Sequence, residues 1–193
     1  MSFIVVAYYT EGTMYEDYVP ILKESLEKFN IPYDIQAVPN LGSWLENTSY
    51  KPTFIKEMLQ KHHHDIVYTD IDSVFMQYPT LFDEMPLGTI IGVHLYDRSL
   101  YLPFRKREEV LSGTIFFKSH PKALEIVEQW EEECTIYIRE WDQRTLQRVL
   151  NGQFYPLPAN YCVIFDVMAD VENPVIVHSQ ASRKVRKKKG RLT

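Results

Sequence analysis

Apolar runs alternate with helix-like patterns over the first third of this chain. The strand-like runs occupy 3–10, 33–38 and 65–72. Between them, helical spacing of apolar side chains predicts one helix over 14–29 and a second that starts near Pro52, a residue suited to a first helical turn. Strands separated by helices of this length predict an α/β fold with a mainly parallel sheet and helices on both faces. Such sheets bind ligands at the carboxyl ends of their strands.

The rest of the chain continues with strands and helices in a less regular order. Further strands are expected at 89–96, 110–118, 154–165 and 175–178, and helices at 120–134 and 140–150. A polar, aromatic loop at 97–109 is placed to cover a site. A chain of 193 residues is long enough for one core and short for two. We therefore expect a single domain over residues 1–182, followed by a basic tail over 183–193.

Charge is distributed unevenly along the chain. The net charge is −5, and seven Lys and Arg residues lie in the last eleven positions, so that the net charge without those seven is −12. An acidic body argues against nucleic-acid binding, which needs a basic face on the folded domain. The tail is expected to be solvated, with attraction to an anionic membrane surface as an alternative.

Cysteine usage and hydropathy bear on location. Cys134 and Cys162 lie on core-facing segments without metal-binding spacing, which favours free thiols in a reducing environment. No hydrophobic signal stretch precedes Phe3, and no apolar run approaches the roughly 20 residues that span a bilayer. A cytoplasmic protein without a transmembrane segment is expected.

Two carboxylates stand where the third expected strand ends. Asp70 and Asp72 follow the apolar run 66–68, and residues two apart on a strand share a face. Two hard oxygen ligands at this spacing can hold Mg²⁺ or Mn²⁺, which also binds phosphate oxygens. The simpler alternative is a strand end capped by solvated aspartates.

Together with three later segments, this Asp-x-Asp motif resembles the GT-A glycosyltransferases, in particular the small nucleotide-diphospho-sugar transferases. His178, in a late strand, is similar to the histidine that completes the metal shell in several such families, although alone it would fit an ordinary strand histidine. Ser112-Gly113 resembles the strand that approaches the donor sugar, and Asp142-Gln143 resembles a pair near the reacting sugar. The frequent HxxGxxKPW ending is absent, which leaves the closing loop without its family motif.

The resemblance implies a nucleotide-sugar donor, with a UDP-sugar favoured, and an acceptor hydroxyl. Donor contacts are expected from the end of the first strand, where ribose and base would lie, and from residues near the metal. The candidates are Ala7, Tyr8, Tyr9, Thr10, Lys51, Asp70, Ile71, Ser112, Gly113, Arg183 and Lys184. One of the two tyrosines could instead pack inward, and Lys51 could be an exposed lysine.

The catalytic candidates are Asp142 and Gln143. In an inverting reaction Asp142 or Glu140 would take the proton of the acceptor hydroxyl. In a retaining reaction, which the resemblance favours, Asp142 and Gln143 would orient groups around a cationic sugar-like transition state. A helix N-cap is the structural alternative for Asp142.

Other functions are compatible with parts of the pattern. A haloacid-dehalogenase-type phosphatase would use Asp70 as nucleophile and Asp72 as acid and base, but its nucleophile strand normally comes first in the chain, whereas two β-α units precede it here. A nucleotidyltransferase needs a glycine-rich loop that 8–12 does not supply. A non-catalytic binding domain is the third alternative. The run 62–64 of three histidines is read as a helix-to-strand linker.

Overall fold

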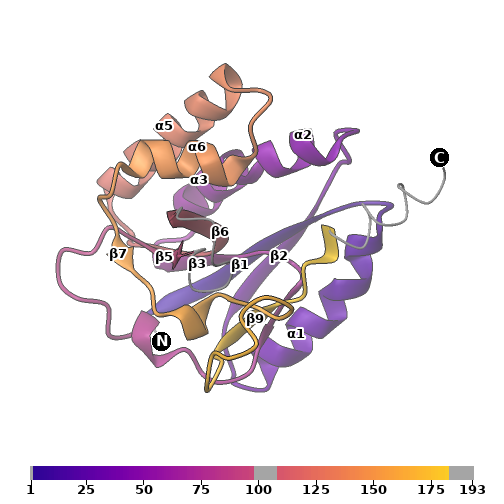
Figure 1. Ribbon diagram of the computed structural model, residues 1–193, viewed down its shortest axis with the longest axis vertical. Coiled ribbons are helices and arrows are strands. Elements are labelled where there is room, and N and C mark those ends of the chain that lie inside the picture. Colours follow the sequence, from indigo (N-terminus) through magenta and orange to yellow (C-terminus); the bar gives the residue numbers. More distant parts are fainter. Residues whose placement is uncertain (1, 98–107, 183–193) are drawn as a thin grey trace.

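The computed structural model describes residues 2–97 and 108–182, which form a six-stranded mixed sheet with a smaller sheet beside it (Figure 1). The strand order of the large sheet is β2-β1-β3-β6-β5-β7. Its strands are β1 (Phe3–Thr10), β2 (Tyr33–Val38), β3 (Asp65–Thr69), β5 (Ile91–Asp97), β6 (Glu108–Phe117) and β7 (Tyr155–Pro156). The small sheet has the order β4-β9-β8, from β4 (Ser73–Phe75), β9 (Ile176–His178) and β8 (Val163–Ile164).

Strand direction in the large sheet is mainly parallel. β1 is parallel to β2 and β3, and β7 is parallel to β5. β6 is antiparallel to both of its neighbours, β3 and β5, so β5 has the same direction as β3. In the described part of the chain, β6 alone reverses direction within this sheet. The expectation of a mixed, mainly parallel sheet is confirmed.

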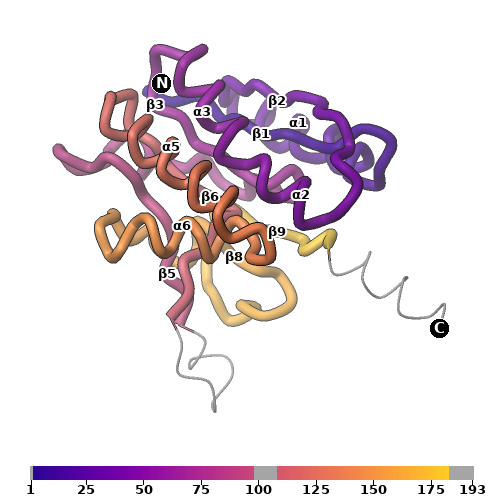
Figure 2. The backbone as a smooth tube through the Cα atoms, turned by 90° about the horizontal axis from the view of Figure 1, so that it is seen from above, coloured from indigo at the N-terminus to yellow at the C-terminus, as the bar shows by residue number. Residues whose placement is uncertain are grey.

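Helices cover both faces of the large sheet, as the sequence predicts. One core lies between the sheet and the helices α3 (Lys51–Lys61), α5 (Pro121–Ile136) and α6 (Asp142–Leu150). The other core lies under α1 (Val19–Glu27) and the small sheet (Figures 1 and 2). Alternation along β1 sorts its side chains between the two, with Val6 and Tyr8 in the first core and Val5 and Ala7 in the second.

The helix expected over 14–29 is divided into two elements. A 3₁₀ helix, η1 (Met14–Tyr18), precedes α1, and Pro20 occupies the first turn of α1. A continuous helix would need a backbone N–H at Pro20, and the proline ring would clash with the preceding turn. A proline therefore starts the second element rather than lying inside one long helix.

Helix α2 (Trp44–Ser49) was not expected. Ser43 caps it by accepting from the Glu46 N–H at 3.1 Å, and the Glu46 carboxylate accepts from the Ser43 N–H at 3.0 Å. This reciprocal capping box has a sequence signature, serine followed three residues later by glutamate. The signal was present at Ser43-Trp44-Leu45-Glu46 and was missed.

The single strand expected over 154–165 is wrong. The segment instead contains β7, the 3₁₀ helix η3 (Ala159–Tyr161) and β8, which pairs with β9 rather than with the large sheet. Pro156 and Pro158 have no backbone N–H for a continuous ladder. A third 3₁₀ helix, η2 (Thr80–Phe82), links β4 toward β5.

Residues 98–107 of the expected covering loop and the basic tail at 183–193 lie outside the described residues. Cys134 and Cys162 are buried and free, as expected. Within 2–97 and 108–182, none of the helices combines the length and the apolar character needed to cross a bilayer.

Candidate active site

Asp70 and Asp72 lie in a turn and not on a strand. β3 ends at Thr69, and the Ser73 N–H donates to the Asp70 carbonyl at 3.0 Å, which closes a turn before β4. The Asp70 N–H donates to the Gly113 carbonyl on β6 at 2.9 Å. The expectation that the two carboxylates share one face of a strand is therefore wrong, because the chain reverses between them.

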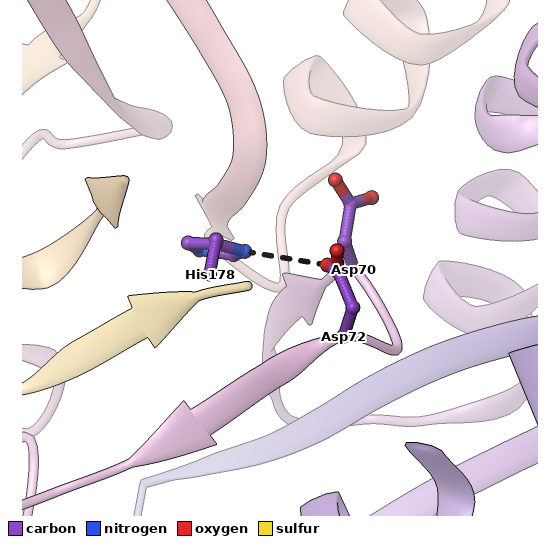
Figure 3. A group of neighbouring side chains, drawn as sticks. All are labelled: Asp70, Asp72 and His178. Carbon is purple, nitrogen blue, oxygen red and sulfur yellow. Dashed lines mark ion pairs between the residues drawn. The ribbon is translucent and has the colours of Figure 1, made fainter. Parts of the chain in front are cut away.

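This turn brings both carboxylates to His178. β4 pairs with β9 so that Ser73 lies opposite His178, at the end of the small sheet. One ligand atom each from Asp70, Asp72 and His178 lies within 4.8 Å of the others. Figure 3 shows the His178 ring pointing at the aspartates, with Nδ1 4.0 Å from Asp72 Oδ1. These three residues, the Asp-Asp-His group, are brought together as the resemblance implies.

The two nitrogens of His178 have different surroundings. Nε2 lies 2.8 Å from the hydroxyl of Thr114 on β6. Nδ1 is buried and has no hydrogen-bond partner among the described residues. Burial alone would lower the pKa of the His178 imidazole. Cys162 and the two aspartates outweigh that effect and raise this pKa to about 9.

Asp72 is almost fully buried. Its Oδ2 accepts a 2.6 Å hydrogen bond from the Ala181 N–H, and its carbonyl accepts from the Ser179 N–H at 3.0 Å. Burial, followed by the negative charge of Asp70, raises the pKa of the Asp72 carboxyl. The segment after β9 is thereby attached to the turn, and Asp72 Oδ1 remains on the side of His178.

Gly113 lies against the Asp-Asp-His group from β6. A Cβ at this position would stand 3.1 Å from His178 Cε1, 3.3 Å from Nδ1 and 3.4 Å from Asp70 Oδ2. The first two distances are tighter than ordinary van der Waals contact. The absence of a side chain at Gly113 keeps the space between Asp70 and His178 open.

Lys51 is buried, so the exposed-lysine alternative is wrong. Its Nζ lies 3.0 Å from Asp70 Oδ1 and 2.9 Å from Asp142 Oδ2, and it also donates to the carbonyl of Ser112. Burial opposes its charge, but Asp142 and Asp70 outweigh burial and raise the pKa of Lys51. The ammonium group therefore joins the Asp-Asp-His group to α6.

Asp142 and Gln143 begin α6 and face β6. Ser112 Oγ donates to Asp142 Oδ2 at 2.7 Å, and Gln143 Oε1 accepts from the Ser112 N–H at 3.3 Å. The N-cap of α6 is Trp141, and the Asp142 side chain is directed to Ser112 and Lys51. The helix-cap alternative for Asp142 is therefore wrong.

The residues expected at the end of β1 are divided between its faces. Ala7 and Thr10 are buried, and Tyr9 is half-buried. Tyr8 is the tyrosine that packs inward, since its ring contacts Tyr50, Phe54 and Tyr68 and its hydroxyl donates to the Asn47 carbonyl at 2.8 Å.

The other expected residues are distributed as follows. Ile71 is buried in the core beside α1, and Arg183 and Lys184 lie outside the described residues. His62 Nε2 lies 2.8 Å from Asp34 Oδ2 at the end of α3, which agrees with the linker interpretation of 62–64.

Three contributors to the site were missed. Thr114 orients His178, the Tyr68 hydroxyl donates to Asp70 Oδ1 at 2.9 Å, and the Ala181 N–H binds Asp72. Thr114 and His178 are 64 positions apart, and Ala181 and Asp72 are 109 apart. No local pattern marks such pairs, because they meet only when β6, β3 and the segment after β9 come together.

The fold matches those of several solved glycosyltransferases. A glycosyltransferase involved in glycosylation of the major capsid of PBCV-1 superimposes with a TM-score of 0.73 at 14% identity, over 98% of both chains. Galactosyltransferase LgtC, solved with donor and acceptor sugar analogs, gives 0.62 at 10% identity, over 92% of this chain and 87% of its own. GlyE of Streptococcus pneumoniae TIGR4 gives 0.61 at 17% identity, and this chain spans 55% of its length.

At these identities the similarity establishes the fold, which is that of the GT-A glycosyltransferases. The family model for nucleotide-diphospho-sugar transferases matches residues 16–192, and the chain belongs to that family. A comparison with curated proteins gave no match. The family assignment does not favour the phosphatase alternative.

Proposed function

We propose that this protein is a metal-dependent glycosyltransferase that moves a hexosyl group from a UDP-sugar to an acceptor hydroxyl, with retention of configuration. The observation that carries the proposal is the Asp-Asp-His group, in which a buried imidazole Nδ1 without a described partner faces two carboxylates. An orphaned buried nitrogen is costly unless a ligand satisfies it.

The donor set suits Mn²⁺ or Mg²⁺. Carboxylate oxygens are preferred by both ions, and an imidazole nitrogen is compatible with Mn²⁺. The raised pKa keeps a proton on each ring nitrogen at neutral pH, so a cation would bind by displacing the Nδ1 proton, which faces Asp72, while Nε2 could keep its contact with Thr114. A bound divalent ion would supply Lewis acidity to the leaving diphosphate.

Several groups of the chain would hold the donor around this centre. The backbone at Ser112 and Gly113 would approach the donor sugar, since Gly113 leaves room beside Asp70. The end of β1, from Ala7 to Thr10, would hold ribose and base through its backbone groups and the half-buried Tyr9, since Tyr8 packs inward, and Ile71 and Lys51 would lie next to the metal ligands. Arg183 and Lys184 would pair with the diphosphate as it leaves.

In the transfer, the acceptor oxygen bonds to the anomeric carbon while the bond from that carbon to the diphosphate oxygen breaks. The electron pair leaves with the diphosphate, and the departing diphosphate oxygen takes up the proton that the acceptor hydroxyl loses. Asp142 Oδ2 is engaged by both Lys51 Nζ and Ser112 Oγ, so this oxygen is not free to take the proton of an acceptor hydroxyl. This supports the retaining alternative, in which Asp142 and Gln143 position the sugar.

A thermal-shift panel of UDP, GDP, CDP and p-nitrophenyl phosphate, each with and without Mn²⁺, tests the proposal. We expect UDP to raise the melting temperature only with Mn²⁺, because a ligand that binds the native state stabilises it. The shift should be lost in Asp72→Asn and kept in Asp170→Asn, which alters an exposed carboxylate. Absence of any nucleotide shift together with turnover of p-nitrophenyl phosphate would replace the transferase with a phosphatase.

Stereochemistry and location need separate tests. The anomeric configuration of the first product, followed by NMR, distinguishes retention from inversion. The two buried free thiols support a reducing, cytoplasmic location. Binding of the full chain to vesicles with and without anionic lipid tests membrane contact through the tail at 183–193.

A further inference from the structure

Two tryptophans meet where α2 and α6 begin. The ring centroids of Trp44 and Trp141 are 6.5 Å apart with an interplanar angle of 69°. Trp44 is 37% exposed and Trp141 is half-buried. The guanidinium of the exposed Arg144 lies over the Trp141 ring, 4.4 Å from its centroid. Trp44, Trp141 and Arg144 together are called the tryptophan platform below.

Both tryptophans of the platform lie in or next to elements that carry residues of the candidate active site. Trp44 begins α2, which leads directly into α3 and Lys51, whereas Trp141 immediately precedes Asp142 at the start of α6. Lys51 and Asp142 form the 2.9 Å ion pair. The platform and the Asp-Asp-His group are therefore connected through Lys51 and Asp142.

The base of the platform is rigidly held. Trp130 is fully buried, and its Nε1 donates to the Asp142 carbonyl at 2.9 Å. The hydroxyl of Thr145 donates to the same carbonyl at 2.8 Å. Because the residue after Trp141 is fixed in this way, the Trp141 ring can meet a ligand without much loss of conformational entropy.

We propose that the tryptophan platform binds the acceptor, and that this acceptor is a carbohydrate. This inference rests on the proposed transferase function. A sugar ring has a face of C–H groups and a rim of hydroxyls, so it can pack on an aromatic ring while its rim accepts hydrogen bonds from a guanidinium. Trp44 and Trp141 supply apolar aromatic surface, and Arg144 supplies donors in one plane.

The position of the tryptophan platform supports binding of the acceptor rather than of the donor. The diphosphate of the donor belongs beside Asp70, Asp72 and His178. Asp70 pairs with Lys51, and Lys51 pairs with Asp142, which lies farther from the Asp-Asp-His group. The tryptophan platform lies next to Asp142. A sugar held there would approach the donor sugar from the side of Asp142, as an acceptor hydroxyl must.

The test compares transfer with hydrolysis of the same UDP-sugar. Radiolabelled UDP-glucose and UDP-galactose are incubated with Mn²⁺ and with a panel of p-nitrophenyl mono- and disaccharides, and both released and transferred sugar are counted. In Trp44→Ala we expect the ratio of transfer to hydrolysis to fall by about tenfold, as when a contact tryptophan is truncated. Trp44→Phe should restore much of the ratio, because it keeps an aromatic face.

Leu87→Ala is the matched control, since Leu87 is a fully exposed apolar residue outside the platform, and the ratio should remain that of wild type. A Trp44→Ala enzyme with the wild-type ratio would overturn the proposal that the platform binds the acceptor, without contradicting the proposed transferase function. Transfer by wild type to peptide hydroxyls and to no glycoside would overturn the carbohydrate assignment. Neither transfer nor hydrolysis of any UDP-sugar by wild type would overturn the proposed function and the platform with it.

Discussion

The Thr114 hydroxyl lies 2.8 Å from His178 Nε2 and so turns the opposite edge of the imidazole, which carries Nδ1, toward Asp72. Both residues are buried, and the opposite nitrogen, Nδ1, is the one without a partner in the described residues. A hydrogen bond at one ring nitrogen orients a histidine and sets its tautomer for a ligand at the other. Thr114 is therefore a positioning residue for the Asp-Asp-His group.

Thr114→Val tests this role, because valine preserves the shape and removes the hydroxyl. We expect Mn²⁺ affinity to fall about ten- to a hundredfold, the usual effect of losing an outer-shell partner of a metal ligand. Free Mn²⁺ measured by EPR at neutral pH gives the affinity directly. Thr114→Ser should bind nearly as wild type. Wild-type Mn²⁺ affinity in Thr114→Val would show that the hydroxyl is not needed to orient His178.

Gly113→Ala tests whether open space beside the ligands matters. The added methyl group would come within 3.1 Å of the His178 ring and would face Asp70. We expect weaker Mn²⁺ binding in a calorimetric titration. The backbone at this glycine needs no left-handed conformation, so any fall in melting temperature without metal would come from displacement of the buried His178 ring. An equal affinity in both proteins would mean that the ligands bind a cation away from Gly113.

Lys51→Met tests the buried ion pair that links the Asp-Asp-His group to α6. Removing the ammonium leaves the buried carboxylate of Asp142 unpaired, so we expect a loss of about 3 kcal/mol in unfolding free energy. Urea unfolding at neutral pH measures this loss. The double variant Lys51→Met/Asp142→Asn should recover part of it, because a neutral amide needs no counter-charge.

Lys118→Met is the matched control for Lys51→Met. Lys118 pairs with Asp65 at a similar distance, 2.8 Å, but half of its side chain is exposed. The Asp65 carboxylate is itself buried, but it also accepts from the Ser119 N–H at 2.8 Å, and the half-exposed ammonium is hydrated, so we expect a smaller loss of about 1 kcal/mol. Equal losses of unfolding free energy in Lys51→Met and Lys118→Met would show that burial of Lys51 does not increase the contribution of its ion pair. If Lys51→Met/Asp142→Asn were no more stable than Lys51→Met, the unpaired Asp142 carboxylate would not be the cause of the loss.

Much of the fold and the two aspartates of the Asp-Asp-His group could be predicted because their signals are local. Apolar runs and helical spacing predicted β1, β2 and β3 and the helices on both faces. The Asp70-x-Asp72 motif predicted the two carboxylates, and the family resemblance, rather than any local signal at His178, added the histidine; the turn between the aspartates was not predicted. The motif therefore identified two carboxylates that lie together, but the strand geometry inferred for them was wrong.

The rest depends on contacts between distant segments. Lys51 and Ser112 are 61 positions apart, and Ser112 and Asp142 are 30 apart. Each has an ordinary local explanation, as an exposed lysine, a strand serine or a helix cap. Only the packing of α3, α6 and β6 turns them into one buried network. The strand predicted over 154–165 is wrong for a local reason, because Pro156 and Pro158 lack the backbone N–H that a continuous strand ladder needs.

The pH dependence of stability should show the contribution of Asp34 on β2. Its Oδ2 lies 2.7 Å from Lys61 Nζ and 2.8 Å from His62 Nε2. Burial would raise the pKa of the Asp34 carboxyl, but hydrogen bonds from Lys61 and His62 outweigh it and hold the pKa below its usual range. Because the unfolded chain takes up this proton at a higher pH than the native protein, the contribution of Asp34 is complete above its unfolded-state pKa of about 4.

This contribution is lost as the pH falls through the lower, folded-state pKa. We therefore expect Asp34→Asn to unfold at a lower urea concentration than wild type at pH 7, and the difference to shrink toward zero in the acid range below about pH 4. Asp170→Asn, at an exposed position, should follow wild type throughout. A difference between Asp34→Asn and wild type that stays constant from pH 7 into the acid range would show that the substitution acts through packing rather than through the charge of Asp34.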